Sequence, residues 1–167
     1  MTRVYVPATL AMLQRLVAEG ELDPVSRTAF AVTASLREAY TAGDDDELAE
    51  VAMAEAARAS LRLLAAEEDD ATFGPRRVVI AADVDDAKPR PDLDDAVVRL
   101  AAAVSMSDLA SVHVDLGAAE SDVARAVAVI DAADLGDEEA EFVLGDAEDH
   151  ELAWYAAQEL PFLLELL

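Results

Sequence analysis

The sequence contains no cysteine, and this absence excludes several kinds of chemistry at once. Without thiols the chain forms no disulfide, offers no thiolate nucleophile and supplies no sulfur ligand to zinc. We therefore expect a cytoplasmic protein. The two histidines, His113 and His150, lack the close spacing that a histidine-based zinc site needs.

Glycine and long apolar runs are also scarce. The six glycines form neither a G-x-G-x-x-G motif nor a P-loop, which excludes the two standard phosphate-binding loops. No apolar run approaches the ~20 residues that cross a bilayer. The opening residues MTRVYVP lack the pattern of a signal peptide. We predict neither membrane insertion nor a bound cofactor.

Positive charge is the third scarcity. Twelve basic residues face 36 acidic ones, the formal net charge is −24, and Lys88 is the single lysine. Direct binding to nucleic acid or to an anionic membrane is disfavoured, because phosphates are bound by cations. The acidity has three interpretations: a halophilic surface, plain solubility, or a surface that complements a basic partner protein.

The 167 residues suit a single domain spanning 1–167, and the apolar fraction of 54% supplies an aliphatic core. Arg77–Val84 is a nearly continuous apolar run, which predicts a buried central strand. The longest helix begins at Asp44–Glu47. The carboxylates of this run lie at the positive end of the helix dipole, where negative charge is stabilising. Its stripe of Leu48, Val51, Ala54, Ala57, Leu61 and Leu64 has helical period, and the acidic run Glu67–Asp70 ends it.

Shorter β-branched runs alternate with helical patterns elsewhere. We expect an α+β fold with a mixed or antiparallel sheet of five or six strands and helices packed on it. The repeated strand-then-helix order also suggests two βαβ-like halves around a proline-rich loop. Pro7 should end the first strand, Thr9 should cap a helix that stops at Gly20, and Ser35 and Ser121 should begin two further helices. The other strands are expected at Arg3–Val6, Thr28–Thr33, Ala96–Leu100, Val112–Leu116 and Leu152–Tyr155, with a terminal helix at Gln158–Leu167.

Several segments together resemble a family of short, acidic, uncharacterised proteins from actinobacteria. They are VYVPATLAMLQRLV, TAFAVTASLREAY, AARASLRLL, RRVVIAADVDD and HELAWYAAQELPFLL, and they span nearly the whole chain. The preference for arginine over lysine is typical of a GC-rich genome. The resemblance implies a cytosolic single-domain protein and carries over no catalytic residue.

A metal site is the strongest chemical hypothesis. Carboxylates gather in the loop after the predicted central strand, at Asp83, Asp85, Asp86, Asp92, Asp94 and Asp95. Clustered carboxylate oxygens suit Mg²⁺, and open α/β sheets place active sites after such strands. VVIAADVDD resembles the Asp-x-Asp strand of haloacid-dehalogenase-like phosphatases, but Ala87 stands where that pattern needs Thr or Val. The alternative is a solvated loop, partly neutralised by nearby basic residues.

Two other features carry weaker hypotheses. His113 and Asp115 alternate on one strand and so share a face, which suits a base with its orienting acid, with Ser105 or Ser107 as nucleophile. A histidine packed in the sheet is the plainer interpretation. At the C-terminus, Phe162 and Leu166 exceed what one helix face needs. They either complete the core or form an exposed patch for a homodimer.

The sequence thus favours an acidic interaction or regulatory protein that binds a basic partner protein. The alternative is a small divalent-metal-dependent enzyme acting on a phosphorylated substrate through Asp83–Asp95, and an acidic domain with a small-molecule pocket is a third interpretation. If a basic partner is the target, acidic runs should converge on one face. We expect Asp83–Asp95 and Asp137–Glu151 to do so.

Overall fold

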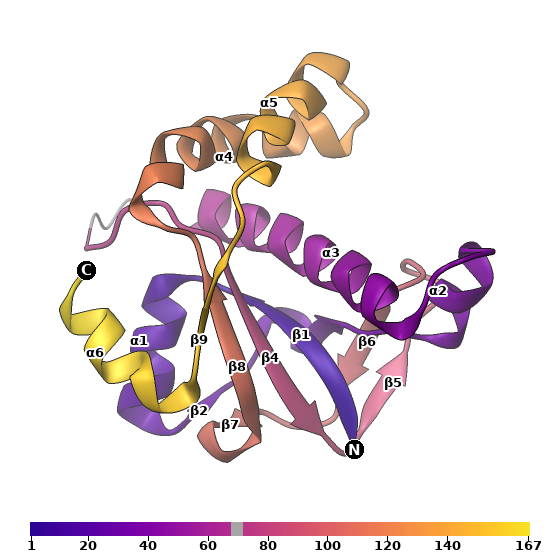
Figure 1. Ribbon diagram of the computed structural model, residues 1–167, viewed down its shortest axis with the longest axis horizontal. Coiled ribbons are helices and arrows are strands. Elements are labelled where there is room, and N and C mark those ends of the chain that lie inside the picture. The colour runs from indigo at the N-terminus through magenta and orange to yellow at the C-terminus, as the bar shows by residue number, and fades with distance from the viewer. Residues whose placement is uncertain (68–71) are drawn as a thin grey trace.

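The computed structural model describes residues 1–67 and 72–167 (Figure 1). Over these residues the chain alternates short strands with six α-helices. The strands are β1 (Thr2–Ala8), β2 (Glu21–Leu22), β3 (Thr28–Phe30), β4 (Val78–Val84), β5 (Ala87–Pro89), β6 (Val97–Leu100), β7 (Val104–Ser105), β8 (Leu109–Val114) and β9 (Ala153–Tyr155). The helices are α1 (Leu10–Glu19), α2 (Ala34–Ala39), α3 (Asp45–Ala66), α4 (Glu120–Asp134), α5 (Glu138–Glu148) and α6 (Leu160–Glu165).

Seven of the strands form one sheet in the order β5-β6-β3-β1-β4-β8-β9, and β2 pairs with β7 in a small second sheet. Every pairing is antiparallel. The predicted α+β class is confirmed. The sheet has seven strands rather than five or six, and of the two expected arrangements it has the antiparallel one. A βαβ unit needs parallel strands, so the described residues hold no βαβ-like halves.

Strand β4 lies between β1 and β8, as the apolar run predicted. Val78, Val79 and Ile80 are fully buried. Successive side chains of a strand point to opposite faces. Val78 and Ile80 therefore join the core under α1 and α6, whereas Val79 joins the core under α3. Burial on both faces explains why this segment has no polar alternation.

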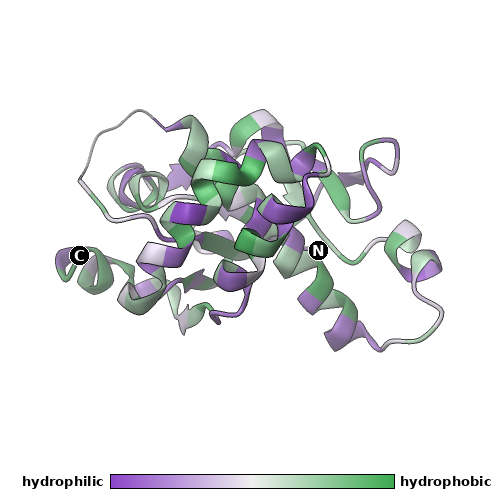
Figure 2. Cartoon of the chain, turned by 90° about the horizontal axis from the view of Figure 1, so that it is seen from above, coloured by the Kyte–Doolittle hydropathy of each residue, from purple (hydrophilic) through white to green (hydrophobic). Residues whose placement is uncertain are grey.

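The sheet is covered by helices on both faces (Figure 1). α1 and α6 contact each other on one face, and α3 crosses β1 and β4 on the other. α4 and α5 form an antiparallel pair that packs on α3. The helices carry alternating hydrophilic and hydrophobic bands (Figure 2). In the described part of the chain, no helix is both long and apolar enough to span a membrane.

Helix ends follow the sequence signals in three places and depart from them in two. Thr9 caps α1 by accepting a hydrogen bond from Met12 N, and Gly20 ends it at φ 82°, a left-handed conformation that suits glycine. Asp44 caps α3 by accepting from Glu47 N. Thr33, not Ser35, caps α2, and α4 begins after Ala119 with no side-chain cap at all.

Two further predictions are wrong: Pro7 does not end the first strand, and Asp85–Asp95 is not entirely a loop. β1 continues through Pro7, which pairs with Val79. On its other side, β1 pairs with β3 only at Tyr5. Pro7 has no N–H to donate, but it therefore interrupts no hydrogen bonds between β1 and β3. The expected loop Asp85–Asp95 contains β5. Of the acidic run Glu67–Asp70, the last three residues lie outside the described residues.

Candidate functional site

The six carboxylates of the predicted metal site are divided among separate partners. Asp83 accepts two hydrogen bonds from Arg3, at 2.7 and 3.1 Å, and this guanidinium lowers the pKa of the Asp83 carboxyl. Asp92 binds Arg90 at 2.9 and 2.7 Å, which lowers the pKa of Asp92. These arginines therefore occupy oxygens that a metal would need.

The remaining four carboxylates do not complete a metal site either. Ser35 donates to Asp95 at 2.6 Å, and Asp94 accepts from the Asp95 backbone N–H at 2.7 Å. Asp85 and Asp86 line an open depression of about 740 Å³ beside β5 and β6. Within residues 1–67 and 72–167, no three histidine or carboxylate side chains gather closely enough to hold a metal ion.

The predicted pair of His113 and Asp115 is not formed. Asp115 follows β8 and accepts three hydrogen bonds from Arg77, each at 2.8 Å, so it is committed to a buried ion pair. His113 instead makes a 2.9 Å contact with Ser111 Oγ, and burial lowers its pKa. Ser105 and Ser107 bond each other at 3.0 Å, which leaves the hypothetical triad without its members in contact.

The apolar residues of the C-terminal segment lie partly in the core and partly on the surface. Leu160 and Leu163 of α6 are buried against the core, whereas Phe162 is 68% and Leu166 is 85% exposed. These two residues do not complete the core. The homodimer through this segment stays a prediction.

A different region has the character of a binding surface: the α4–α5 hairpin, residues 120–149. It carries eleven acidic residues and one basic residue, Arg125. Its inner face is apolar and packs with Leu61 of α3. The buried inner residues are Val123, Ala126, Ile130, Ala133, Ala140, Leu144 and Ala147.

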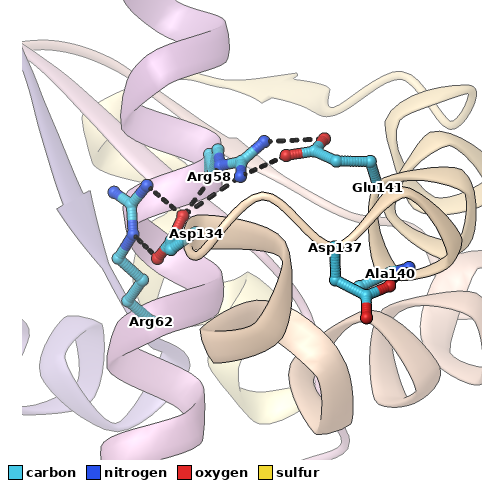
Figure 3. Close-up of polar contacts among 6 residues, drawn as sticks. All are labelled: Arg58, Arg62, Asp134, Asp137, Ala140 and Glu141. Atoms are coloured by element: carbon cyan, nitrogen blue, oxygen red, sulfur yellow. Dashed lines mark hydrogen bonds and ion pairs between the residues drawn. The ribbon is translucent and has the colours of Figure 1, made fainter.

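Two arginines of α3 hold this hairpin in place (Figure 3). Arg58 contacts Asp134 of α4 at 3.1 Å and Glu141 of α5 at 2.7 Å. Arg62 contacts Asp134 at 2.7 Å. The two guanidinium groups lower the pKa of Asp134, and Arg58 lowers the pKa of Glu141. Because Arg58 contacts both Asp134 of α4 and Glu141 of α5, the three helices are tied together.

The turn between the two helices is equally well defined. Gly136 has φ 93°, a conformation that L side chains rarely adopt, and it reverses the chain after α4. Asp137 then caps α5 by accepting from Ala140 N at 2.9 Å (Figure 3). The hairpin is therefore anchored by its core, its ion pairs and its turn.

The outer face of α5 presents an aromatic side chain among acids. Phe142 is 80% exposed. Glu138 lies four residues before it, Glu139 three before and Asp146 four after, so all three carboxylates neighbour Phe142 on the helix surface. Glu138 and Glu139 form no ion pair with any described residue. An apolar anchor with an acidic rim results.

Glu55 of α3 carries a perturbed carboxyl. Burial raises the pKa of Glu55, and the charge of Asp94 raises it further, whereas Arg62 and Arg58 lower it. The convergence of the acidic runs Asp83–Asp95 and Asp137–Glu151 on one face stays a prediction.

Sequence reasoning missed Arg58 and Arg62. Their spacing of four residues placed them on one face of a helix, which was a usable signal. Their acidic partners lie 72–83 residues further along the chain, and nothing local identifies them.

The fold and this surface define an antiparallel α+β protein with a strongly acidic helical hairpin. The chain belongs to DUF6912, a family of unknown function whose match covers residues 2–164. This agrees with the resemblance to an uncharacterised family. Neither a curated protein nor a solved structure matches the chain.

Proposed function

We propose that this protein is a cytoplasmic interaction or regulatory protein that binds a basic partner protein through the α4–α5 hairpin. The observation that carries the proposal is Phe142, an exposed aromatic residue surrounded by carboxylates on a firmly held helix. The cysteine-free composition supports a reducing compartment, and the preference for arginine over lysine supports an actinobacterial source.

The two parts of this surface would do different work in binding. Aromatic anchors in a desolvated centre provide most of the affinity of many interfaces. Charged rims steer the partner and fix its register more than they add affinity. Phe142 would enter an apolar pocket, while Glu138 and Glu139 would face lysines or arginines of the partner; Asp146 already lies 3.8 Å from Arg125.

The anchoring of the hairpin favours this role. Binding costs free energy when loops and side chains must be ordered. Here α5 is already held by the contact of Arg58 with Glu141 and by the core that it shares with α4, and Arg58 and Arg62 hold α4, so the outer face of α5 is preorganised. Acidity that serves only solubility needs no exposed phenylalanine at its centre, which is why this surface favours a partner over a solvent adaptation.

The test is quantitative capture from a native lysate of the source organism, with proteins identified by mass spectrometry. Wild type is compared with F142A and with the double variant E138Q/E139Q. The matched control is E19Q/E50Q, which removes the same charge from exposed residues outside the hairpin that lack ion pairs. Each variant's melting temperature is measured first, because Glu138 and Glu139 also oppose the helix dipole.

We expect wild type and E19Q/E50Q to capture a common basic protein in a salt-sensitive manner. F142A and E138Q/E139Q should capture it at least about tenfold less, as the loss of one hot-spot contact implies. Equal capture by all four proteins would show that the hairpin does not bind the partner. An acidic captured protein would contradict the charge argument.

The alternative, a divalent-metal-dependent enzyme using Asp83–Asp95, stays a prediction from the sequence. No specific observation favours it, since the arginines Arg3 and Arg90 bind two of its carboxylates. The geometry therefore supports the interaction proposal better.

A further inference from the structure

The side chains of three of the twelve basic residues, Arg15, Lys88 and Arg99, make no ion pair or hydrogen bond with any residue that the structure describes. Arg15 stands alone on α1. Lys88 and Arg99 are directly opposite each other on β5 and β6. Like charges in this position destabilise a pair of strands. A chain with 36 acidic residues nevertheless leaves both of these cations without a carboxylate.

An acid near Arg99 is already bound to another arginine. Asp92 is close enough to Arg99 for that charge to contribute to its lowered pKa, but both of its oxygens bind Arg90. Asp92 thus fixes Arg90 and leaves Arg99 free.

Protection of a sheet edge explains only part of this arrangement. β5 is the edge strand, and Lys88 and Pro89 are residues that commonly prevent edge-to-edge pairing. Arg99 lies on β6, which has β5 on one side and β3 on the other. Edge protection therefore does not account for an unpaired arginine there.

Lys88 and Arg99 also line the open depression of about 740 Å³, together with Arg90. Ala87, Pro89 and Leu100 also line the depression, but they alternate with these cations along the strands and point to the opposite face of the sheet. A guanidinium fork and an ammonium group, set side by side on one face, suit a single oxyanion group. Asp85 and Asp86 also line the depression, and they disfavour a ligand that carries many negative charges.

We propose that the depression beside β5 and β6 binds the single oxyanion group, phosphate or carboxylate, of a small molecule through Lys88 and Arg99. The site involves none of the hairpin residues, so it stands or falls independently of the proposed partner. The ligand would relieve the repulsion between the two cations, and so its binding should stabilise the fold.

The test is an amide NMR titration of the full chain with inorganic phosphate, and in parallel with acetate, at constant ionic strength. A thermal melt accompanies each titration. The variants are K88Q and R99Q, and the matched control is R15Q, which removes the same charge from the third unpaired cation. Neither test variant breaks a side-chain hydrogen bond or ion pair with a described residue, so both should fold as wild type does.

We expect saturable shifts of the amides of β5 and β6 and a raised melting temperature in wild type and R15Q. K88Q and R99Q should bind at least about tenfold more weakly, as the loss of a charge-assisted hydrogen bond implies. Stronger shifts with phosphate or with acetate identify which oxyanion the site takes. If neither anion saturates, or if K88Q and R99Q bind as R15Q does, the proposal is wrong.

Discussion

Arg77 and Asp115 are the two charged side chains that are buried in the described part of the chain, at 3% and 0% exposure. Asp115 accepts from the Arg77 backbone and from two of its guanidinium nitrogens. Arg77 also donates to the His150 carbonyl at 2.9 Å. The start of β4, the end of β8 and the approach to β9 are therefore joined by one side chain.

Removing one member of this pair leaves a buried charge uncompensated. We predict that R77M lowers the free energy of unfolding by about 3–5 kcal/mol. The double variant R77M/D115L should recover much of that loss, because apolar replacements of a buried pair are often neutral. Urea denaturation measures both.

R37M is the matched control, because Arg37 pairs with Asp45 on the exposed surface. Its cost should stay below about 1 kcal/mol. If R77M also lowers the free energy of unfolding by less than about 1 kcal/mol, the buried pair stabilises the fold no more than an exposed pair does.

At the scale of elements, the α4–α5 hairpin is the part whose position depends on charge. Arg62 and Arg58 lower the pKa of Asp134, and Arg58 lowers that of Glu141. A carboxyl with a lowered pKa in the fold contributes stability above its unfolded pKa and loses it as the pH falls through the folded pKa. The hairpin should therefore loosen below the ordinary values of 3.8 for Asp and 4.5 for Glu.

We predict that R58A speeds hydrogen exchange in α4 and α5 at neutral pH. The free energy of opening should fall by about 1 kcal/mol, a small amount because the contacts of Arg58 are partly exposed. Its α4–α5 protection should also depend less on pH than that of wild type between neutrality and the acidic range. R125A is the control, since Arg125 pairs with Asp122 of its own helix and with Asp146 of α5, but with no described residue of α3. If R125A loosens the hairpin as much as R58A, the tie to α3 is not what holds it.

At the scale of the whole molecule, the net charge of −24 acts against the fold. Like charges repel in the compact state, and salt screens charges that lie more than ~8 Å apart at physiological ionic strength. We predict that the melting temperature rises modestly as sodium chloride is raised from low to about 0.15 M, where the screening length has shortened to ~8 Å. A fall would mean that the surface ion pairs, which salt weakens, outweigh the repulsion.

The described fold was predictable where the sequence pattern is local. The cap at Thr9, the stop at Gly20 and the helix start at Asp44–Glu47 depend on residues within one turn, and all three predictions are confirmed. The sequence left the choice between a mixed and an antiparallel sheet open, because strand pairing depends on how distant strands meet. β5 was hidden in a loop expected from its prolines and charges, since an edge strand of three residues has almost no periodicity.

The same division holds for the sites. The acidic run at Asp83–Asp95 is visible in the sequence, but the hydrogen bonds of its members to Arg3, Arg90 and Ser35 are not. Of these partners only Arg90 is close in sequence. The anchor of the hairpin joins Arg58 to Glu141 across 83 residues, a separation at which no pattern carries information.

The sequence by itself determined the α+β class, the buried strand Val78–Ala82, the long helix after Asp44 and the strong negative charge. Each of these depends on composition or on a period that neighbouring residues define. The tertiary structure alone decided which acids meet an arginine and which stay free. It also set Phe142 outward among carboxylates and placed Lys88 opposite Arg99. Those outcomes depend on strand register and helix packing, because electrostatic contacts are made by proximity in space and not by order along the chain.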